Sequence, residues 1–336
     1  MKNLLLVGGT GSFGQAYLSH LQASGFEGRI RIFSRDEDKQ APLKRLFPDL
    51  DLEPIIGDVR DLESYTQAVN KMDLVIHAAA LKHVPVGELF TEEVLKTNTQ
   101  GVLNCVKACQ TKGVEKAIYL STDKAVYPIN AYGMTKALGE KIFQSKLSQD
   151  TETTFCITRY GNVLGSRGSI LPVVAKQVAE GQKIQITDFA MTRFVMTLAQ
   201  AVGLVNQAIA KGQDGQLFIR EVPACDLYTL VDGYLQFCHG QTLEDYGYSV
   251  VGIRPGEKIH EALATEEEML RAHRQEESIY CLDPYLQREL FQATRDHTEL
   301  RHPEALTSLN VPKLALEEYT ELLKQAGFQA FGTGQT

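Results

Sequence analysis

The chain lacks several features that would place it in well-defined classes. Its 336 residues contain no apolar run that approaches the length of a membrane span, and the N-terminal apolar run is too short for a signal peptide. Its six cysteines form no C-x-x-C pair, and its eight histidines show no H-E-x-x-H spacing. We therefore expect a cytoplasmic protein with reduced cysteines, no metal site and no attachment to a membrane.

The chain also lacks an excess of positive charge. The formal net charge is -8 at pH 7, which argues against nucleic acid or an anionic membrane as the main partner. An anionic small ligand is still compatible with this balance, because a local basic pocket is enough to bind one. A hydrophobic content of 43% over 336 residues is sufficient for one large domain or two unequal lobes.

A glycine-rich turn follows the first expected strand, residues 2–7. Gly8, Gly11 and Gly14 form a G-x-x-G-x-x-G turn, and residues 15–25 have helical spacing. Strand, glycine turn and helix in this order indicate a dinucleotide site, because the backbone can approach a pyrophosphate and the helix N-terminus offers N–H donors. The predicted cofactor contacts in this turn are Gly8, Thr10, Gly11, Ser12, Phe13 and Gly14.

The second expected strand, residues 29–33, ends in Ser34, Arg35 and Asp36. An acidic residue at this place usually binds a ribose hydroxyl, whereas an arginine accommodates the 2′-phosphate of NADP. Because Arg35 comes first and Lys39 follows, the sequence favours NADP over NAD. Asp36 leaves another possibility open, since it could pair with Lys39 on the surface.

Further strands and helices alternate through the first half of the chain. A strand at residues 53–57 leads to Asp58 and Val59, and one at 74–77 leads to Ala78, Ala79 and Ala80. Asp58 could hold the adenine amino group or instead cap the next helix, 61–72. The three alanines allow close approach of a flat ligand such as the cofactor, or serve packing alone. Val59, and Asn98 in a long helix over 92–113, join the predicted cofactor contacts only through the family resemblance described below. The alternation predicts an α/β fold with a Rossmann-like, doubly wound parallel sheet.

The most informative stretch is residues 121–136, STDKAVYPINAYGMTK. It follows an apolar strand at 117–121, whose end would carry Thr122 to the ligand-binding rim of the sheet. Tyr132 and Lys136 lie four residues apart on a helix capped by Asn130, so they share one face. A nearby ammonium would lower the pKa of the phenol, which suggests proton and hydride transfer. A chance Y-x-x-x-K pair exposed to solvent is the alternative.

The second half continues with a strand at 154–158, a helix at 170–181 and a strand at 183–187. Met191 to Phe194 is expected to open the helix 197–212, and a strand follows at 216–222. We expect residues 1–165 and about 194–222 to form the dinucleotide-binding domain, 166–193 and 223–330 a smaller lobe, and 331–336 a tail. Arginine suits bidentate phosphate binding, so we expect two or more of four arginines to meet a diphosphate, although each could be a surface ion pair: Arg159, Arg167, Arg193 and Arg254.

Together these stretches resemble the extended short-chain dehydrogenase/reductase superfamily. The resemblance rests on GGTGSFG, IIGDVRD, HAAALKHVP, LSTDKAVYPINAYGMTK, TRYGNVLGSRGSILP, MTRF and RPGEKIHEAL, spread over about residues 2–270. Within it, the chain is similar to inverting UDP-N-acetylglucosamine 4,6-dehydratases and their capsular polysaccharide dehydratase-epimerase relatives. The resemblance implies bound NADP, UDP-N-acetylglucosamine in the C-terminal lobe, and a homo-oligomer, either a dimer or a larger ring.

The resemblance also implies roles for single residues. Tyr132, supported by Lys136, would take the C4 hydroxyl proton while Thr122 holds that hydroxyl. Lys124, made neutral by burial, would remove the C5 proton, and Asp123 would protonate the leaving C6 hydroxyl. Tyr132 and Lys136 would also contact NADP. The implied contacts with the nucleotide sugar are Lys82, Asn162, Arg167, Arg193, Arg254 and Glu257, of which Lys82 could instead be an ordinary solvated lysine.

Two other functions fit the same fold. A UDP-sugar 4-epimerase or 4-keto reductase would share Tyr132 and Lys136 but would not need Asp123 and Lys124 for elimination. A non-catalytic NADP-binding protein would not need an intact Tyr/Lys pair. Because function resides in the site and not in the fold, these residues favour the dehydratase. The resemblance further implies inversion at C5 and a role in bacterial surface glycan synthesis.

Overall fold

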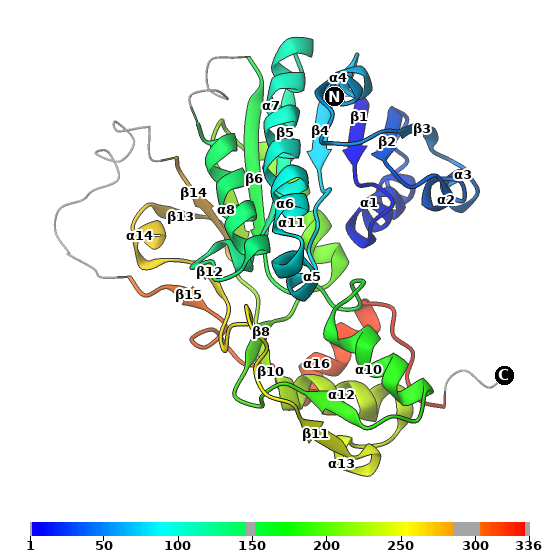
Figure 1. Cartoon of the computed structure of the whole chain (residues 1–336), viewed down its shortest axis with the longest axis vertical. Helices are drawn as coiled ribbons and strands as arrows, with labels where there is room; N and C mark the ends of the chain where they lie inside the picture. The colour runs from blue at the N-terminus through cyan, green and yellow to red at the C-terminus, as the bar shows by residue number, and fades with distance from the viewer. Residues whose placement is uncertain (1, 146–151, 285–302, 333–336) are drawn as a thin grey trace.

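The computed structural model describes residues 2–145, 152–284 and 303–332 (Figure 1). Its larger part is an α/β unit around one sheet, and a smaller, mainly helical part lies below it in the view. Residues 333–336 of the expected tail lie outside the described residues. Within the described ranges, no helix is both long and apolar enough to cross a membrane.

One mixed sheet organises the larger part. From β3 to β9 neighbouring strands are parallel, and the hairpin of β14 and β13 adds to this edge in antiparallel fashion. The order reverses between β1 and β4, and ligands of such folds bind at the carboxyl ends of the strands there. The strand order is β3 (Asp51–Ile56), β2 (Arg29–Ser34), β1 (Asn3–Val7), β4 (Leu74–His77), β5 (Lys116–Thr122), β6 (Thr154–Tyr160), β9 (Leu217–Arg220), β14 (Ile279–Leu282) and β13 (Ala272–Glu276).

Helices cover both faces of this sheet, which explains why its inner strands are continuous apolar runs. One face packs against α4 (Leu62–Val69), α7 (Gly101–Lys112) and α8 (Ala131–Phe143), and the other against α1 (Ser12–Ala23), α3 (Leu43–Leu46) and α11 (Leu198–Lys211). The predicted Rossmann-like, doubly wound architecture is therefore confirmed. Short helices complete this part: α2 (Glu37–Gln40), α5 (Val84–Leu89), α6 (Thr91–Leu95), the π-helix η1 (Lys96–Gln100) and the 3-10 helix η2 (Asp123–Ala125).

The smaller part has its own apolar core between four helices and two short strands. It is built from α10 (Ile170–Ala179), β7 (Ile184–Ile186), α12 (Leu227–His239), α13 (Leu243–Tyr246), β11 (Tyr248–Val250) and α16 (Leu316–Gln325). Short elements lie between this core and the large sheet (Figure 1). They are β8 (Thr192–Phe194), β10 (Ala224–Asp226), β12 (Ala262–Ala264) and β15 (Leu306–Thr307), whereas α14 (Glu266–Met269) lies beside β13 at the edge of the sheet (Figure 1).

The structure differs from the sequence predictions in three places. Met191 to Phe194 does not open a helix: its last three residues form β8, paired with β10, and α11 begins only after Thr197, whose side chain caps it. The long helix over 92–113 contains a π-helical turn at η1. The hairpin β13–β14 lies in the range expected for the smaller lobe, yet it extends the large sheet.

Candidate active site

The glycine turn after β1 has the geometry that a dinucleotide site requires. The Gly11 amide donates to the Gly8 carbonyl at 2.9 Å. Gly8 has φ +79, and a Cβ there would lie 2.9 Å from the Ala79 nitrogen, so the turn passes close to the end of β4. No side chain caps the start of α1. Its first amides are therefore available to an anionic group, which fits the pyrophosphate of a dinucleotide.

The residues at the end of β2 divide into paired and available groups. The Lys39 ammonium hydrogen-bonds the Asp36 carboxylate, as the alternative interpretation of this pair had it. The Arg35 side chain is 52% exposed, and its Nη1 lies 3.9 Å from Asp58 Oδ2. Lys39 is equally exposed, at 53%, but it is bonded to Asp36, so Arg35 is the less tightly paired of the two cations at this strand end. The Ser34 hydroxyl accepts a hydrogen bond from Gln40.

Asp58 is held by a second arginine that the sequence analysis did not single out. Arg60 donates to Asp58 Oδ2 through Nε at 2.8 Å and through Nη2 at 2.5 Å. Burial raises the pKa of Asp58, but Arg60 and Arg35 outweigh it and lower that pKa below its usual value. Asp58 does not cap the following helix, because Asp61 accepts the capping bonds of α4.

The π-helical turn η1 positions Asn98. Its Oδ1 accepts from the Leu81 amide at 2.8 Å, and its Nδ2 donates to the Leu81 carbonyl at 3.0 Å. Nδ2 also donates to the Thr135 hydroxyl of α8 at 3.2 Å. Because π-helical turns often occur at functional sites, this one is notable: it lets a single amide fix the loop after β4 against the helix that carries Tyr132.

The first turn of α8 packs tightly against η2. Asn130 caps the helix by accepting from the Gly133 amide at 2.7 Å, as predicted. A Cβ at Gly133 would lie 2.1 Å from the Lys124 carbonyl oxygen, so only glycine allows this approach. The close contact brings Tyr132, one residue before Gly133, to the same place as Thr122.

The two residues of the predicted Tyr/Lys pair have different surroundings. Burial raises the pKa of Tyr132 to about 12, although the Lys124 charge and a side-chain hydrogen bond with Thr122 act in the opposite direction. The Lys136 ammonium donates to the Leu120 carbonyl at 2.5 Å and lies 4.0 Å from the centre of the Tyr119 ring. Burial lowers the pKa of Lys136 to about 7, against the effect of Glu140. In this structure, Lys124 is thus a cation that favours the phenolate form of Tyr132.

A buried cluster of charged groups surrounds Lys124. Its Nζ lies 3.2 Å from Asp123 Oδ1 and 3.1 Å from Glu261 Oε1, and the Thr122 hydroxyl donates to Asp123 Oδ1 at 2.8 Å. Glu261 is 2% exposed and also faces Lys258 at 3.8 Å. Sequence reasoning missed Glu261 and Lys258, although both lie in the RPGEKIHEAL stretch and a run of charged residues there was the available signal.

The cluster fixes the protonation of its members. Burial raises the pKa of Asp123, and the Glu261 carboxylate raises it further, so Asp123 retains its proton more readily than an ordinary aspartic acid. Burial would lower the pKa of Lys124, but Asp123 and Glu261 outweigh burial and raise it. Lys124 is therefore charged in the structure, which differs from the expectation that burial would make it neutral.

The four arginines singled out by the sequence have different positions. Arg159 is buried and donates to Glu140 and Glu268, so it is a structural ion pair and not a phosphate ligand. Arg167 donates from Nη2 to the Thr10 carbonyl at 2.6 Å, so it lies over the glycine turn. Its charge also acts on Asp36 and Lys82, at the mouth of the same site.

The remaining predicted substrate contacts lie around β8 and the loop before β12. Arg193 donates to the carbonyls of Thr192 and Ile259, and its charge acts on Lys124 and Glu261. Arg254 is half exposed, with Nη1 4.0 Å from Glu257 Oε1 in its own turn. Asn162 has a buried Oδ1 without a hydrogen-bond partner, which leaves it free to accept from a ligand.

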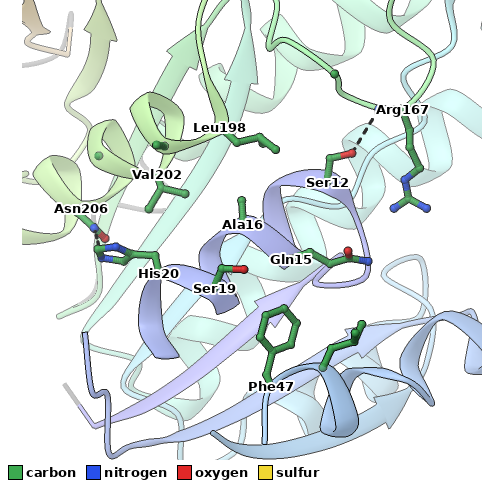
Figure 2. A pocket seen from close by; sticks show the side chains of 14 residues that line it. Ser12, Gln15, Ala16, Ser19, His20, Phe47, Arg167, Leu198, Val202 and Asn206 are labelled. Carbon is green, nitrogen blue, oxygen red and sulfur yellow. Dashed lines mark hydrogen bonds between the residues drawn. The ribbon is translucent and has the colours of Figure 1, made fainter. Parts of the chain in front are cut away.

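A large cavity lies away from the acid–base cluster. It has a volume of about 990 Å³ and runs between α1 and α11 (Figure 2). Ser12 and Arg167 lie at one end, and His20 and Asn206 at the other. Its lining does not include Thr122, Asp123, Lys124 or Tyr132. The cavity is thus separate from the acid–base cluster at the end of β5, and its Ser12 end adjoins the glycine turn.

Among the described residues, one group could hold a metal ion. His273, Cys281 and Asp283 offer donor atoms within 4.8 Å of one another on the hairpin β13–β14. The group lies at the edge of the sheet and includes no member of the Asp123–Lys124–Glu261 cluster.

Comparison with known proteins identifies the family of this chain. The family model described as "Polysaccharide biosynthesis protein" matches residues 4–283. The chain belongs to this family. The sequence is 40% identical over 330 residues to a UDP-glucose 4-epimerase of Rickettsia massiliae (strain Mtu5), with 96% of this chain and 95% of that one covered.

Solved structures show the same fold. The X-ray structure of Pen from Bacillus thuringiensis superposes with a TM-score of 0.86 at 33% identity, covering 97% of this chain and 98% of that one. DesIV, a dTDP-glucose 4,6-dehydratase from Streptomyces venezuelae solved with NAD and TYD bound, superposes with a TM-score of 0.68 at 19% identity, covering 76% and 86%. The fold is thus one that nucleotide-sugar dehydratases and epimerases use.

Proposed function

We propose that this chain converts UDP-N-acetylglucosamine to a UDP-2-acetamido-2,6-dideoxy-4-keto-hexose for polysaccharide synthesis, with inversion at C5. The single observation that carries the proposal is the buried contact of Asp123 with Lys124 beside Thr122 and Tyr132. Epimerisation at C4 needs acid–base chemistry at C4 alone. Loss of water across C5 and C6 needs two further groups, an acid and a base, and this cluster supplies both.

NADP is the cofactor in this proposal, and when bound it would accept the C4 hydride and give it back at C6. The residues present fit a dinucleotide: the uncapped start of α1 suits the pyrophosphate, and Gly8 allows close approach. Arg35, half exposed at the end of β2, favours NADP over NAD. Arg167, which the sequence assigned to the sugar nucleotide, is closer to the cofactor side because it bonds Thr10.

The acid–base steps follow from the contacts of four residues. Tyr132 takes the C4 hydroxyl proton, and Lys124 and Thr122 favour its phenolate form. The C4 ketone then acidifies C5–H. Asp123, whose pKa is raised by burial, protonates the departing C6 hydroxyl. Thr122 hydrogen-bonds both Tyr132 and Asp123, so the proton gained at C4 has a path to the acid that gives one up at C6. Each positioned group contributes about 10²–10⁴-fold.

The nucleotide sugar is assigned to the smaller part of the chain, in line with the proposed division into a dinucleotide domain and a substrate lobe. Arg193 and Arg254 would meet the diphosphate, and Arg193 already acts electrostatically on the catalytic cluster. Asn162, with its unpartnered buried oxygen, Glu257 and Lys82 complete the proposed contacts. Burial and the charge of Arg167 lower the pKa of Lys82, so a bound anion beside these two cations would be stabilised.

We also propose that the enzyme is a homo-oligomer. Apolar side chains are exposed along α5, α6 and α8, among them Leu89 at 80% and Phe90 at 59%. Exposed apolar patches of this kind indicate association surfaces. Sedimentation of the wild type and of Leu89→Glu would test the assignment: we expect the variant to shift to a smaller species, and an unchanged monomer in both would contradict it.

The proposal is tested by NMR of the protein with UDP-N-acetylglucosamine in deuterated water. We expect a C6 methyl signal, deuterium at C5 and a 4-keto carbon, with coupling constants that report the C5 configuration. Asp123→Asn and Lys124→Met should lose the methyl signal. Recovery of unchanged substrate from the wild type would overturn the proposal.

A UDP-sugar 4-epimerase is the second candidate, because the Rickettsia relatives carry that name at 40% identity. Tyr132 and Thr122 would serve that reaction equally well. It predicts a 4-epimeric product without a methyl group, and it predicts that Asp123→Asn retains activity. The same NMR experiment therefore separates the two candidates.

A further inference from the structure

Lys124 poses a chemical problem for the proposed function. A lysine removes a proton from carbon only as the neutral amine, yet Lys124 Nζ lies within 3.2 Å of two carboxyl groups that favour its charged form. One of them, Asp123, is needed as the acid for the C6 hydroxyl. The other, Glu261, has no role in the proposed chemistry so far.

Glu261 is placed to exchange a proton with Lys124. Its Oε1 lies 3.1 Å from Lys124 Nζ, and its side chain is 2% exposed against 23% for Lys124, so the carboxyl end of this contact is shielded from bulk water. Its Oε2 is buried without a hydrogen-bond partner and has Lys258 Nζ at 3.8 Å. The Ser308 hydroxyl accepts from its backbone amide at 2.9 Å, which fixes the residue where β12 begins.

The two carboxyl groups that share Lys124 are held in different states. Asp123 faces Glu261 and Lys124, and its pKa is raised mainly by burial. Glu261 faces Lys124, Lys258 and Arg193, and these charges outweigh burial and lower its pKa. When the pKa values of two neighbouring titratable groups are shifted in opposite directions, one group serves as the acid and the other as the proton acceptor.

We propose that Glu261 and Lys124 act together as the base for C5. The proton on Lys124 Nζ moves to Glu261 Oε1, which leaves a neutral amine and a neutral carboxylic acid. The amine then takes the C5 proton; the electron pair of that C–H bond becomes the C5–C6 double bond as the C6–O bond breaks, and Asp123 supplies the proton that completes water. Because inversion requires the new C5 proton on the face opposite Lys124, water supplies that proton as hydride returns to C6. Glu261 gives up its proton to balance the hydroxide formed, which leaves Lys124 charged and Glu261 ionised as at the start.

This inference rests on the proposed dehydratase function, and its signature is a pH dependence. In the wild type the proton passes between Lys124 and Glu261 without exchange with solvent, so the base should be equally available at each pH where Glu261 is ionised. In Glu261→Gln the lysine keeps a hydrogen-bond partner but must lose its proton to solvent. The available amine should then rise about tenfold per pH unit below the lysine pKa. The other titratable and charged groups at the cluster are the same in the wild type and in the variant: Asp123, Lys258, Arg193 and Tyr132.

The test measures exchange of the C5 proton in the purified 4-keto-6-deoxy sugar that keeps the C5 configuration of the substrate, and therefore presents this proton to Lys124, in deuterated water at about pH 6 to 9. This reaction isolates the base from oxidation and from loss of water. We expect wild-type exchange to vary little with pH, and Glu261→Gln to be about 10²-fold slower at pH 7 with a tenfold rise per pH unit. Lys124→Met should abolish exchange. Glu266→Gln, an exposed carboxylate in α14 that bonds Tyr127, is the matched control.

Two results would overturn the inference. One is a flat Glu261→Gln profile at the wild-type rate. The other is a profile parallel to the wild type at a reduced rate, which is what a merely structural role produces. If the wild type makes no 4-keto-6-deoxy product from UDP-N-acetylglucosamine, the proposed function itself fails, and that result is read from product formation and not from the exchange profiles.

Discussion

Replacing Lys136 by methionine should change how the stability of the protein depends on pH. Burial lowers the pKa of Lys136 from 10.5 to about 7 in the unliganded chain. At 1.36 kcal/mol per pH unit, this difference corresponds to about 5 kcal/mol. Between the two values the unfolded chain binds a proton that the folded chain does not, so the wild type gains stability as pH rises. Below pH 7 the full cost of the buried ammonium is present, and above about pH 10.5 it is gone.

The methionine variant has no such group, so its stability relative to the wild type should fall as pH rises. It also loses the hydrogen bond to the Leu120 carbonyl, but that loss is the same at each pH. Urea unfolding of both proteins should show their difference in unfolding free energy moving by about 2–3 kcal/mol in favour of the wild type between pH 7 and pH 9. Parallel stability curves for the two proteins would refute the burial argument. Saturating NADP should reduce the effect, because cofactor hydroxyls would stabilise the ammonium.

Two further substitutions test the packing of the site. Arg159→Met should cost about 3–5 kcal/mol in unfolding free energy, because Glu140 and Glu268 would remain buried without this arginine. The folded variant should retain its affinity for UDP, measured by calorimetry. A loss of affinity at unchanged stability would restore the interpretation of Arg159 as a phosphate ligand. Gly133→Ala should lower the unfolding free energy by about 1–3 kcal/mol and reduce turnover at least tenfold, because its Cβ would displace the Lys124 carbonyl. Turnover at the wild-type rate in this variant would contradict the close contact.

Local signals predicted the first half of the chain well. The strand before Gly8, the glycine turn and α1 follow one another as expected, and Asn130 caps α8. These features depend on residues close in sequence, where capping and turn chemistry act directly. The start of α11 is also local: Thr197 with Gln200 forms a capping box at the place where the sequence put the helix. The error concerned Met191 to Phe194, whose last three residues pair with the distant β10.

Long-range contacts account for the rest. Arg159 sits at a strand end that suggested phosphate binding, and only the fold brings Glu268 to it. Glu261 meets Lys124 from a distant part of the chain, so no local pattern could place it in the acid–base cluster. The predicted charge state of Lys124 was wrong for the same reason. Burial alone favours a neutral amine, but Asp123 and Glu261 outweigh burial and raise the pKa of Lys124.

The most direct test of the account follows the hydrogen at C4. UDP-N-acetylglucosamine carrying deuterium at C4 should yield a 4-keto product whose C6 methyl group contains one deuterium, because the hydride removed from C4 returns to C6 of the same sugar. Mass spectrometry and NMR of the product would locate the label. Deuterium returned to C4 of an epimeric sugar, with the C6 hydroxyl intact, would contradict the dehydratase function and establish the epimerase.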